Sequence, residues 1–272
     1  MRAKTKNYLN NRDILEEIHK SKNTYSIFLL ETDHQFDIIL PNLERINIRT
    51  LAQAKRNRAE RIQRRLYEAA LADGQKVKAN DFLQDWKKID KHDLVIRINT
   101  YDHIPLDPTR KKNPKTVADH HEKCNFPAFQ HYRFDENTEL QLVGKSHWTG
   151  GLSNGHFCID HGNFTDKLAI MFTKLCDRYG TKYNWRNYTY NDEMRGQALV
   201  HLCNVGLQFD ENKSQNPFAW YTAVITNSFT RVLNLEKRNQ SVRDDILEIN
   251  GMTPSYTRQN ENQNQIASPD KK

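Results

Sequence analysis

Residues 191–238 read NDEMRGQALVHLCNVGLQFDENKSQNPFAWYTAVITNSFTRVLNLEKR, and this stretch carries the most regular helical pattern of the chain. Asn191-Asp192-Glu193 places a cap and negative charge at the start of one helix, where both suit the helix dipole. Asn216-Pro217 starts the next helix with a cap followed by proline at the first helical position. Apolar residues recur at helical spacing in each segment: Met194, Ala198, Leu202 and Val205, then Phe218, Tyr221, Ile225, Phe229, Val232 and Leu233. We therefore expect two amphipathic helices here.

Three further segments are predicted to be helical. Asn10 or Asn11 can cap a short helix that reaches Lys22, with an apolar stripe of Ile14, Leu15 and Ile18. Residues 43–72 are dense in arginine, and the Asp73-Gly74 pair that follows is a natural helix stop. Thr165-Asp166 can cap a third helix, which ends at Gly180.

Residues 93–162 have a different character. Leu94 to Ile98 reads as a strand, and prolines and a glycine-rich stretch follow it. We expect a loop-rich α+β insertion with short strands, inside a chain that is otherwise mainly α. The expected organisation is a helical segment with a basic arm (1–92), the insertion (93–162), a helical core (163–250) and a flexible polar tail (251–272).

The composition favours a polyanionic partner. The chain has 272 residues with 41 Lys+Arg against 34 Asp+Glu, a formal charge of +7. No apolar run approaches the length that spans a bilayer, and the first residues contain no apolar leader segment. We therefore expect no membrane partner and a cytoplasmic protein. Its four cysteines are more consistent with reduced thiols or a metal site than with disulfides.

Residues 218–238 interleave aromatic rings with hydrogen-bonding and cationic side chains. Trp220, Tyr221 and Phe229 alternate with amides, hydroxyls and guanidinium groups. Rings can stack on unpaired bases, polar groups can read base edges and cations can hold phosphates. The composition alone is equally typical of an amphipathic helix with a solvated polar face, and by itself favours that reading.

A family resemblance favours the nucleic-acid reading. Gly206-Leu207, Phe209-Asp210, Phe218, Tyr221 and Arg231 resemble, in order and spacing, the second conserved region of bacterial sigma factors. The closest resemblance is to the late-transcription sigma factors of T-even-type myoviruses, particularly those of cyanophages. The shared core is represented by Phe209-Asp210-Glu211, Lys213, Asn216-Pro217, Ala219 and Thr222, and residues 8–18 (YLNNRDILEEI) resemble the start of that family.

The resemblance implies a fold, a function and site residues. The fold is a sigma region-two helical core on the C-terminal side, and the function is not enzymatic: the protein directs the host core RNA polymerase to late promoters and melts an A·T-rich box. The polymerase clamp helices would contact Asp192, Glu193, Arg195 and Gln197. The expected DNA-binding residues are Phe209, Trp220, Tyr221, Asn227, Thr230, Arg231, Asn234, Lys237 and Arg238. Among these, Phe209 and Tyr221 match the family positions that line a pocket for a flipped adenine.

The sequence also departs from the family. Val224-Ile225 stands where many housekeeping sigma factors have paired tryptophans, and no helix-turn-helix domain follows. Late sigma factors of this type have a hydrophobic and acidic C-terminal tail for the polymerase flap and the phage sliding clamp, with a coactivator as a further partner. The polar segment 259–272 lacks that character, and only residues 244–249 (DDILEI) resemble it.

Histidines and cysteines gather between residues 120 and 161. His120, Cys124, Cys158 and His161 have ligand-like spacing and could form a Cys2His2 zinc site, the only cofactor that we consider. The spacing is not that of a standard finger, so individual packing of these residues is the favoured reading.

Two other functions remain as alternatives. A single-stranded nucleic-acid binding protein would share the rings and the charge but would need no polymerase. A metal-dependent nuclease of the HNH type could use Asp119-His120-His121, although Asn154, His156 and His161 approximate the expected downstream spacing only loosely. The arginine-rich helix could be a solvated face, or could contact duplex DNA or an acidic polymerase surface.

Overall fold

Most of the predicted helices start within one residue of the expected position in the structure, a computed structural model that describes residues 9–110, 113 and 115–267. The exception is the arginine-rich segment 43–72, in which the α-helix starts only at Ile48, after a cap at Asn47. Helix α1 spans Asn11–Asn23, and the side chain of Asn10 accepts a hydrogen bond from the Asp13 amide at 2.8 Å. Helices α3 (Asp166–Gly180) and α5 (Pro217–Ile249) begin directly after the expected caps Thr165 and Asn216. Helix α4 (Asn191–Val205) already includes the expected cap Asn191, whose side chain donates to the Gly180 and Trp185 carbonyls. These boundaries follow local rules, because a cap satisfies amide groups that the helix itself cannot.

The chain forms two compact units with a composition that is mainly helical. About 51% of the structure is helical and a small mixed sheet accompanies the helices. The first unit contains residues 1–171 and 204–218, and the second contains residues 172–203 and 219–272. Among the described residues, no helix is both long enough and apolar enough to cross a membrane.

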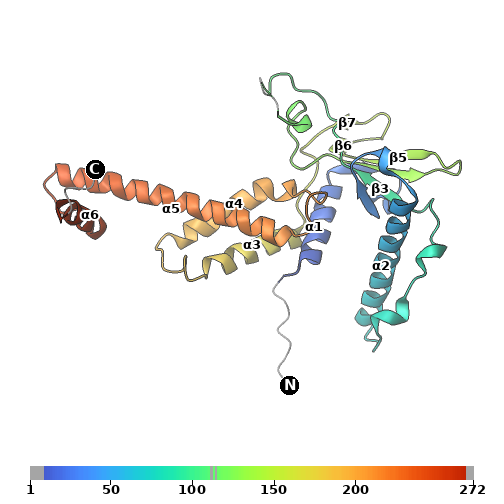
Figure 1. Ribbon diagram of the computed structural model, residues 1–272, viewed down its shortest axis with the longest axis horizontal. Coiled ribbons are helices and arrows are strands. Elements are labelled where there is room, and N and C mark those ends of the chain that lie inside the picture. Colours follow the sequence, from blue (N-terminus) through green and yellow to red (C-terminus); the bar gives the residue numbers. More distant parts are fainter. Residues whose placement is uncertain (1–8, 111–112, 114, 268–272) are drawn as a thin grey trace. The chain divides into compact units, whose positions relative to one another are not determined.

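A five-stranded sheet forms the centre of the first unit (Figure 1). Its strand order is β1-β5-β4-β3-β2, and only the β2–β3 pair is parallel. The strands are β1 (Ser26–Phe28), β2 (Ile38–Leu40), β3 (Val95–Ile98), β4 (Gln130–Phe134) and β5 (Leu140–Ser146). A separate two-stranded sheet pairs β6 (Trp148–Thr149) with β7 (His156–Phe157).

This sheet divides the chain differently from the predicted segments. Strands β1 and β2 precede the expected boundary at residue 92, yet they pair with β5 and β3 from beyond it. Residues 26–40 and 95–146 therefore fold together, and the expected insertion is part of a larger α+β unit. Strand pairing across such separations leaves no local pattern from which it could be read.

Helix α2 (Ile48–Ala72) is joined to this sheet by a buried carboxylate. Arg61 on α2 donates to Asp37 at 2.6 Å, and the Val95 amide of β3 donates to the same carboxylate at 2.9 Å. The Asp37 side chain is 0% exposed. Helix α2 ends at the predicted stop, where Gly74 adopts φ 76°. The arginine-rich segment is thus anchored, at least in part, through one of its own arginines.

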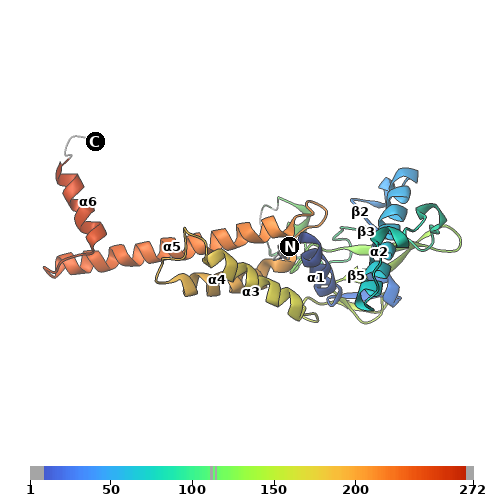
Figure 2. The same ribbon diagram turned by 90° about the horizontal axis from the view of Figure 1, so that it is seen from below.

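Helices α3, α4 and α5, most of whose residues belong to the second unit, lie side by side (Figure 2). Aromatic rings pack at the centre of this bundle: Phe172 meets Tyr221 with ring centroids 4.9 Å apart, and Tyr179 meets Phe229 at 5.1 Å. The Tyr179 hydroxyl is also 2.7 Å from the hydroxyl oxygen of Thr226. The predicted apolar stripe of α5 therefore packs against α3.

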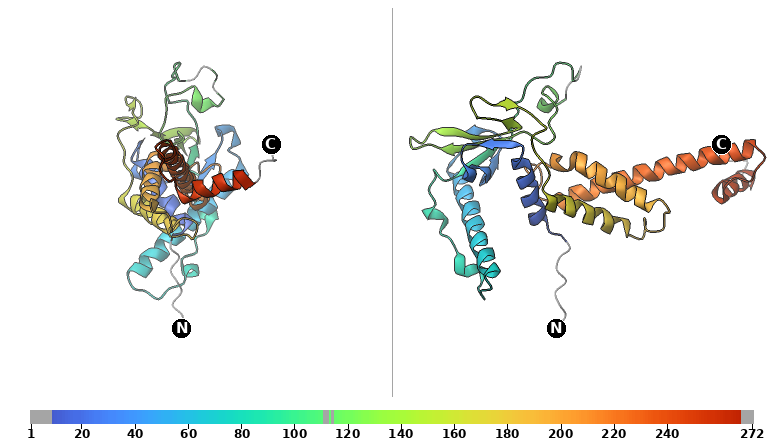
Figure 3. Two further views of the ribbon diagram at one scale, coloured as in Figure 1. Left: turned by 90° about the vertical axis from the view of Figure 1, so that its left-hand side faces the viewer. Right: turned by 180° about the vertical axis from the view of Figure 1, so that it is seen from behind.

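Helix α5 extends beyond α3 and α4, and helix α6 (Tyr256–Ala267) turns back beside its far end (Figure 3). Asp244 of α5 accepts a hydrogen bond from the Ser255 amide at 2.8 Å. Arg258 of α6 forms ion pairs with Asp245 and, at 3.4 Å, with Glu248. The segment predicted as a flexible tail (251–272) thus contains a helix from Tyr256 to Ala267, and residues 268–272 lie outside the described residues.

Candidate nucleic-acid interface

One face of α5 presents a continuous stripe of polar side chains. Trp220, Asn227, Arg231, Asn234 and Arg238 follow one another at spacings of three, four or seven residues, which places them on one side of a helix. Trp220 is half-buried and the other four are exposed. We call these five residues the α5 stripe.

The opposite face of α5 fixes the orientation of the stripe. Tyr221, Ile225, Phe229 and Val232 are between 0% and 6% exposed and belong to the core of the second unit. Burial of these side chains leaves the α5 stripe directed away from that core. Thr230 and Lys237, the other two polar residues that the sequence singled out, are exposed and lie beside the stripe.

The chemistry of the α5 stripe suits a nucleic-acid strand. Arg231 and Arg238 can neutralise phosphates, and the amides of Asn227 and Asn234 can donate to and accept from base edges. Trp220 offers an indole ring close to the surface, with its centroid 5.1 Å from that of Tyr221. The polar part of the predicted DNA-binding set is therefore brought together on one accessible surface.

The two rings expected to line a base pocket are placed elsewhere. Phe209 is 1% exposed and Tyr221 is 0% exposed, so solvent reaches neither ring in this structure. Their assignment as base-binding residues stays a prediction. Binding of a base to either ring would require the side chains packed around it to move away. Trp220 is the ring of the predicted set that solvent reaches.

The four predicted polymerase-binding residues lie together at the start of α4. Glu193 and Gln197 hydrogen bond to each other at 3.0 Å, and Arg195 pairs with Asp192 and, at 3.2 Å, with Asp177. The Asp192 side chain is 88% exposed. A cavity of about 470 Å³ adjoins them, lined by Asp177, Gly180, Thr181, Arg186, Tyr188, Thr189, Asn191, Asp192 and Arg195. The surface is accessible and carries both signs of charge.

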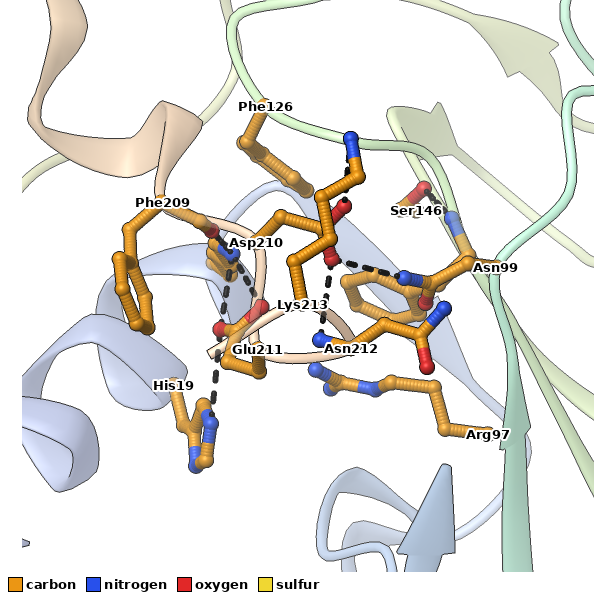
Figure 4. A network of polar contacts seen from close by, with 12 residues as sticks. His19, Arg97, Asn99, Phe126, Ser146, Phe209, Asp210, Glu211, Asn212 and Lys213 are labelled. Carbon is orange, nitrogen blue, oxygen red and sulfur yellow. Dashed lines mark hydrogen bonds and ion pairs between the residues drawn. The ribbon is translucent and has the colours of Figure 1, made fainter. Parts of the chain in front are cut away.

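A buried ion pair, which the sequence reasoning missed, holds the Phe209–Glu211 motif within the first unit (Figure 4). The Lys22 ammonium donates to both Glu211 carboxylate oxygens at 2.8 Å and to the Phe209 carbonyl at 2.7 Å. His19 lies 3.4 Å from the same carboxylate. Burial by itself would raise the pKa of Glu211, but Lys22 and His19 hold that pKa well below its ordinary range. Glu211 is therefore ionised.

Further hydrogen bonds around the Lys22–Glu211 pair hold the Phe209–Glu211 motif in a turn. Asp210 accepts a hydrogen bond from the Asn212 amide at 3.0 Å and from the Asn99 side chain at 3.3 Å. Lys213 lies 3.5 Å from the Asp210 carboxylate. Asp210, Glu211 and Lys213, which carry the family resemblance, thus have structural contacts within the first unit (Figure 4).

Arg97 occupies the interior of the same unit. Its guanidinium lies between the rings of Phe36 and Phe129, 3.9 and 3.8 Å from their centroids, and its Nε donates to His131 Nε2 at 2.8 Å. Burial lowers the pKa of Arg97 to about 9. Because His131 Nε2 accepts from Arg97, its Nδ1 carries the proton and donates to the Asp33 carbonyl at 2.7 Å.

The folded protein should therefore lose stability in mild acid. Burial, and then the Arg97 charge, hold the pKa of His131 well below its ordinary value. In mild acid His131 is therefore protonated in the unfolded chain but stays neutral in the folded protein. The contribution of neutral His131 to the free energy of unfolding is complete above the pKa that this residue has in the unfolded chain. It is lost progressively as the pH falls below that pKa. Between pH 7.5 and 5.5 we expect His131 alone to remove about 1.4 kcal/mol from the free energy of unfolding.

Urea unfolding of His131→Gln at both pH values checks this expectation. Glutamine keeps an acceptor but does not titrate, so the variant should show a smaller loss than the wild-type protein. His156→Gln, which changes an exposed histidine, should keep the full loss. An equal loss in wild type and His131→Gln would contradict the role of His131.

The predicted zinc residues gain no support from the structure. Among the described residues, no group of three or more His, Cys, Asp or Glu side chains is placed to hold a metal ion. Cys124 donates its thiol to the Glu122 carbonyl at 3.6 Å, and the ring of His161 lies against that of Tyr25 with centroids 6.0 Å apart. The zinc site formed with His120 and Cys158 stays a prediction.

The residues considered for nuclease chemistry have structural contacts. Asp119 accepts hydrogen bonds from the amide and hydroxyl of Thr116 at 3.1 and 3.0 Å, which caps a short 3-10 helix. His121 Nδ1 is 2.8 Å from the Ile104 carbonyl. Asp119 and His121 thus have structural contacts, and the nuclease alternative stays a prediction.

Comparison with known proteins adds no relative to these observations. No family model, no curated protein and no solved structure matches this chain.

Proposed function

We propose that this protein is a sigma-type specificity subunit, which binds bacterial core RNA polymerase and contacts an opened promoter strand through the α5 stripe. The observation that supports this most directly is the exposure of six predicted DNA-binding residues on one side of α5: Asn227, Thr230, Arg231, Asn234, Lys237 and Arg238. The assignment of core RNA polymerase and promoter DNA as partners rests on the sequence resemblance to late-phage sigma factors.

The proposal assigns separate surfaces to the two partners. The start of α4 carries exposed Asp192, Glu193 and Gln197 for the polymerase clamp helices, whereas the α5 stripe faces the non-template strand. Cations on the stripe bind phosphates, so affinity should fall as salt rises. Trp220 provides a stacking surface for one unpaired base. No residue is assigned a catalytic role.

A second candidate is a sequence-tolerant single-strand binding protein. The burial of Phe209 and Tyr221 favours it, because an open stripe without a closed base pocket can hold a strand with little base selectivity. Promoter recognition, in contrast, requires a site that distinguishes bases. The two candidates differ in whether core polymerase is needed.

Run-off transcription with purified core polymerase on a phage late promoter tests the proposal. Addition of this protein should give a transcript with a defined start, and Arg231→Gln should reduce its yield roughly tenfold, since one charge-assisted phosphate contact is lost. Arg243→Gln is the matched control, because Arg243 is exposed on the same helix but lies off the α5 stripe.

Two results would count against the proposal. Tight binding of single-stranded DNA without a polymerase complex or a transcript would favour the second candidate. Equal transcript yields from Arg231→Gln and Arg243→Gln, with wild type active, would remove the α5 stripe from promoter contact.

A further inference from the structure

A cavity of about 350 Å³ in the first unit lies between α2 and the short 3-10 helix Glu31–His34. Three arginines give its lining a positive character, and the full set of lining residues is Glu31, Thr32, His34, Gln35, Arg58, Arg61, Ile62 and Arg65. We call it the arginine pocket. It is separate from the α5 stripe, which belongs to the second unit.

Three arginines form one wall of the arginine pocket. Arg58, Arg61 and Arg65 are three and four residues apart along α2, so they lie on one face of that helix. This face is part of the charge run whose role the sequence left open.

Contacts behind the wall hold two of these guanidinium groups in position. Arg61 donates to the Phe36 carbonyl at 2.7 Å and to Asp37 at 2.6 Å. Arg58 lies 3.4 Å from the same carboxylate and donates to the Asp93 carbonyl at 2.5 Å. Preorganised donors lose little conformational entropy when an anion binds.

The charge of the pocket is not balanced by its own acids. Asp37 neutralises one of the arginine charges from behind, and Glu31 is the only carboxylate in the lining. Arg65 is exposed and, among the described residues, no acid forms an ion pair with it. Three guanidinium groups against two carboxylates leave an excess positive charge.

The remaining polar lining favours an oxyanion with several acceptor oxygens. The Thr32 hydroxyl and the Gln35 amide also line the pocket and can each donate a hydrogen bond, whereas His34 Nδ1 is already hydrogen bonded to the Glu31 carbonyl. A phosphate group presents oxygens in several directions, whereas the oxygens of a carboxylate lie in one plane. We propose that the arginine pocket binds a phosphate group.

The phosphate could belong to a nucleic-acid backbone or to a small phosphate compound, and the experiment separates these sources. Two probes are titrated into the full-length protein: sodium pyrophosphate, followed by calorimetry, and a fluorescein-labelled DNA duplex, followed by anisotropy. Arg65→Gln is the test variant, because Arg65 is exposed and carries no ion pair that supports the fold. Arg49→Gln on the same helix is the matched control, since it changes the charge equally and lies outside the pocket.

We expect Arg65→Gln to weaken binding of at least one probe about tenfold, as for loss of one charge-assisted hydrogen bond, while Arg49→Gln has a smaller effect. An effect on the duplex alone assigns the pocket to backbone phosphates, and an effect on pyrophosphate alone assigns it to a small phosphate compound. If the wild-type protein binds neither probe, or if the two variants behave alike with both, the proposal is overturned. None of these measurements involves polymerase. Phosphate binding in the arginine pocket can therefore be disproved while the proposed sigma-type function stands.

Discussion

Glu211→Met should lower the free energy of unfolding by about 3–5 kcal/mol, because it leaves the ammonium of Lys22 buried without its counter-charge. The Lys22 side chain is 1% exposed and that of Glu211 is 9% exposed, so water cannot replace the lost partner. Lys22→Met should have a comparable effect for the converse reason. Urea unfolding of the full chain at pH 7.5 measures both.

The double variant Lys22→Met with Glu211→Met separates a lost charge partner from a general packing defect. Two apolar side chains of similar length remove both desolvated charges, and such replacements are often nearly neutral. We therefore expect the double variant to be more stable than either single variant. Destabilisation equal to the sum of the two single effects would contradict the ion-pair explanation, because independent sites add.

Phe229→Ala should destabilise the second unit by about 3–5 kcal/mol. The ring is 0% exposed and meets Tyr179 and Trp185 with centroids 5.1 and 5.4 Å away, so its removal leaves a cavity in the aromatic core. Loss of the near-ultraviolet circular dichroism signal during urea unfolding, which reports on packed rings, measures the change.

Thr230→Ala is the control for this core substitution. Thr230 is the next residue along α5 and is exposed, so its replacement should change stability by no more than about 0.5 kcal/mol. Similar destabilisation by the two variants would mean that the face of α5 assigned to the core is not the one that packs.

The helices could be predicted because their signals are local. Asn10, Thr165 and Asn216 mark helix starts through groups within a few residues, and the structure confirms each of these helices. The sheet could not be predicted as a whole. Strands β1, β2 and β3 each lie in a short apolar run, but pairing of β1 with β5 joins residues that are far apart in the chain.

The exposure of the polar residues in the candidate site could be predicted from the sequence, but the burial of its aromatic residues could not. Exposure of Arg231 and Asn234 follows from helical periodicity, which sets them opposite Phe229. Tyr221 satisfies two patterns at once, since it belongs both to the apolar stripe and to the sigma-like motif. Sequence alone does not decide between them, and in the structure its ring is in the core.

The buried Lys22–Glu211 ion pair could have been predicted in part from the sequence of α1. Lys22 follows Ile14 and Ile18 at four-residue steps, which puts an ammonium on the apolar face of α1. A charge in that position needs a buried partner. The partner itself, Glu211, could not be identified, because it comes from a distant part of the chain.

The chain passes between the two units after Met171, after Cys203 and after Phe218. No single cut separates one unit from the other, so neither exists as one uninterrupted stretch of the gene. Exchange of either unit by recombination would need several breakpoints at once. A single crossover at any of these three points would therefore leave at least one unit assembled from two parental sequences.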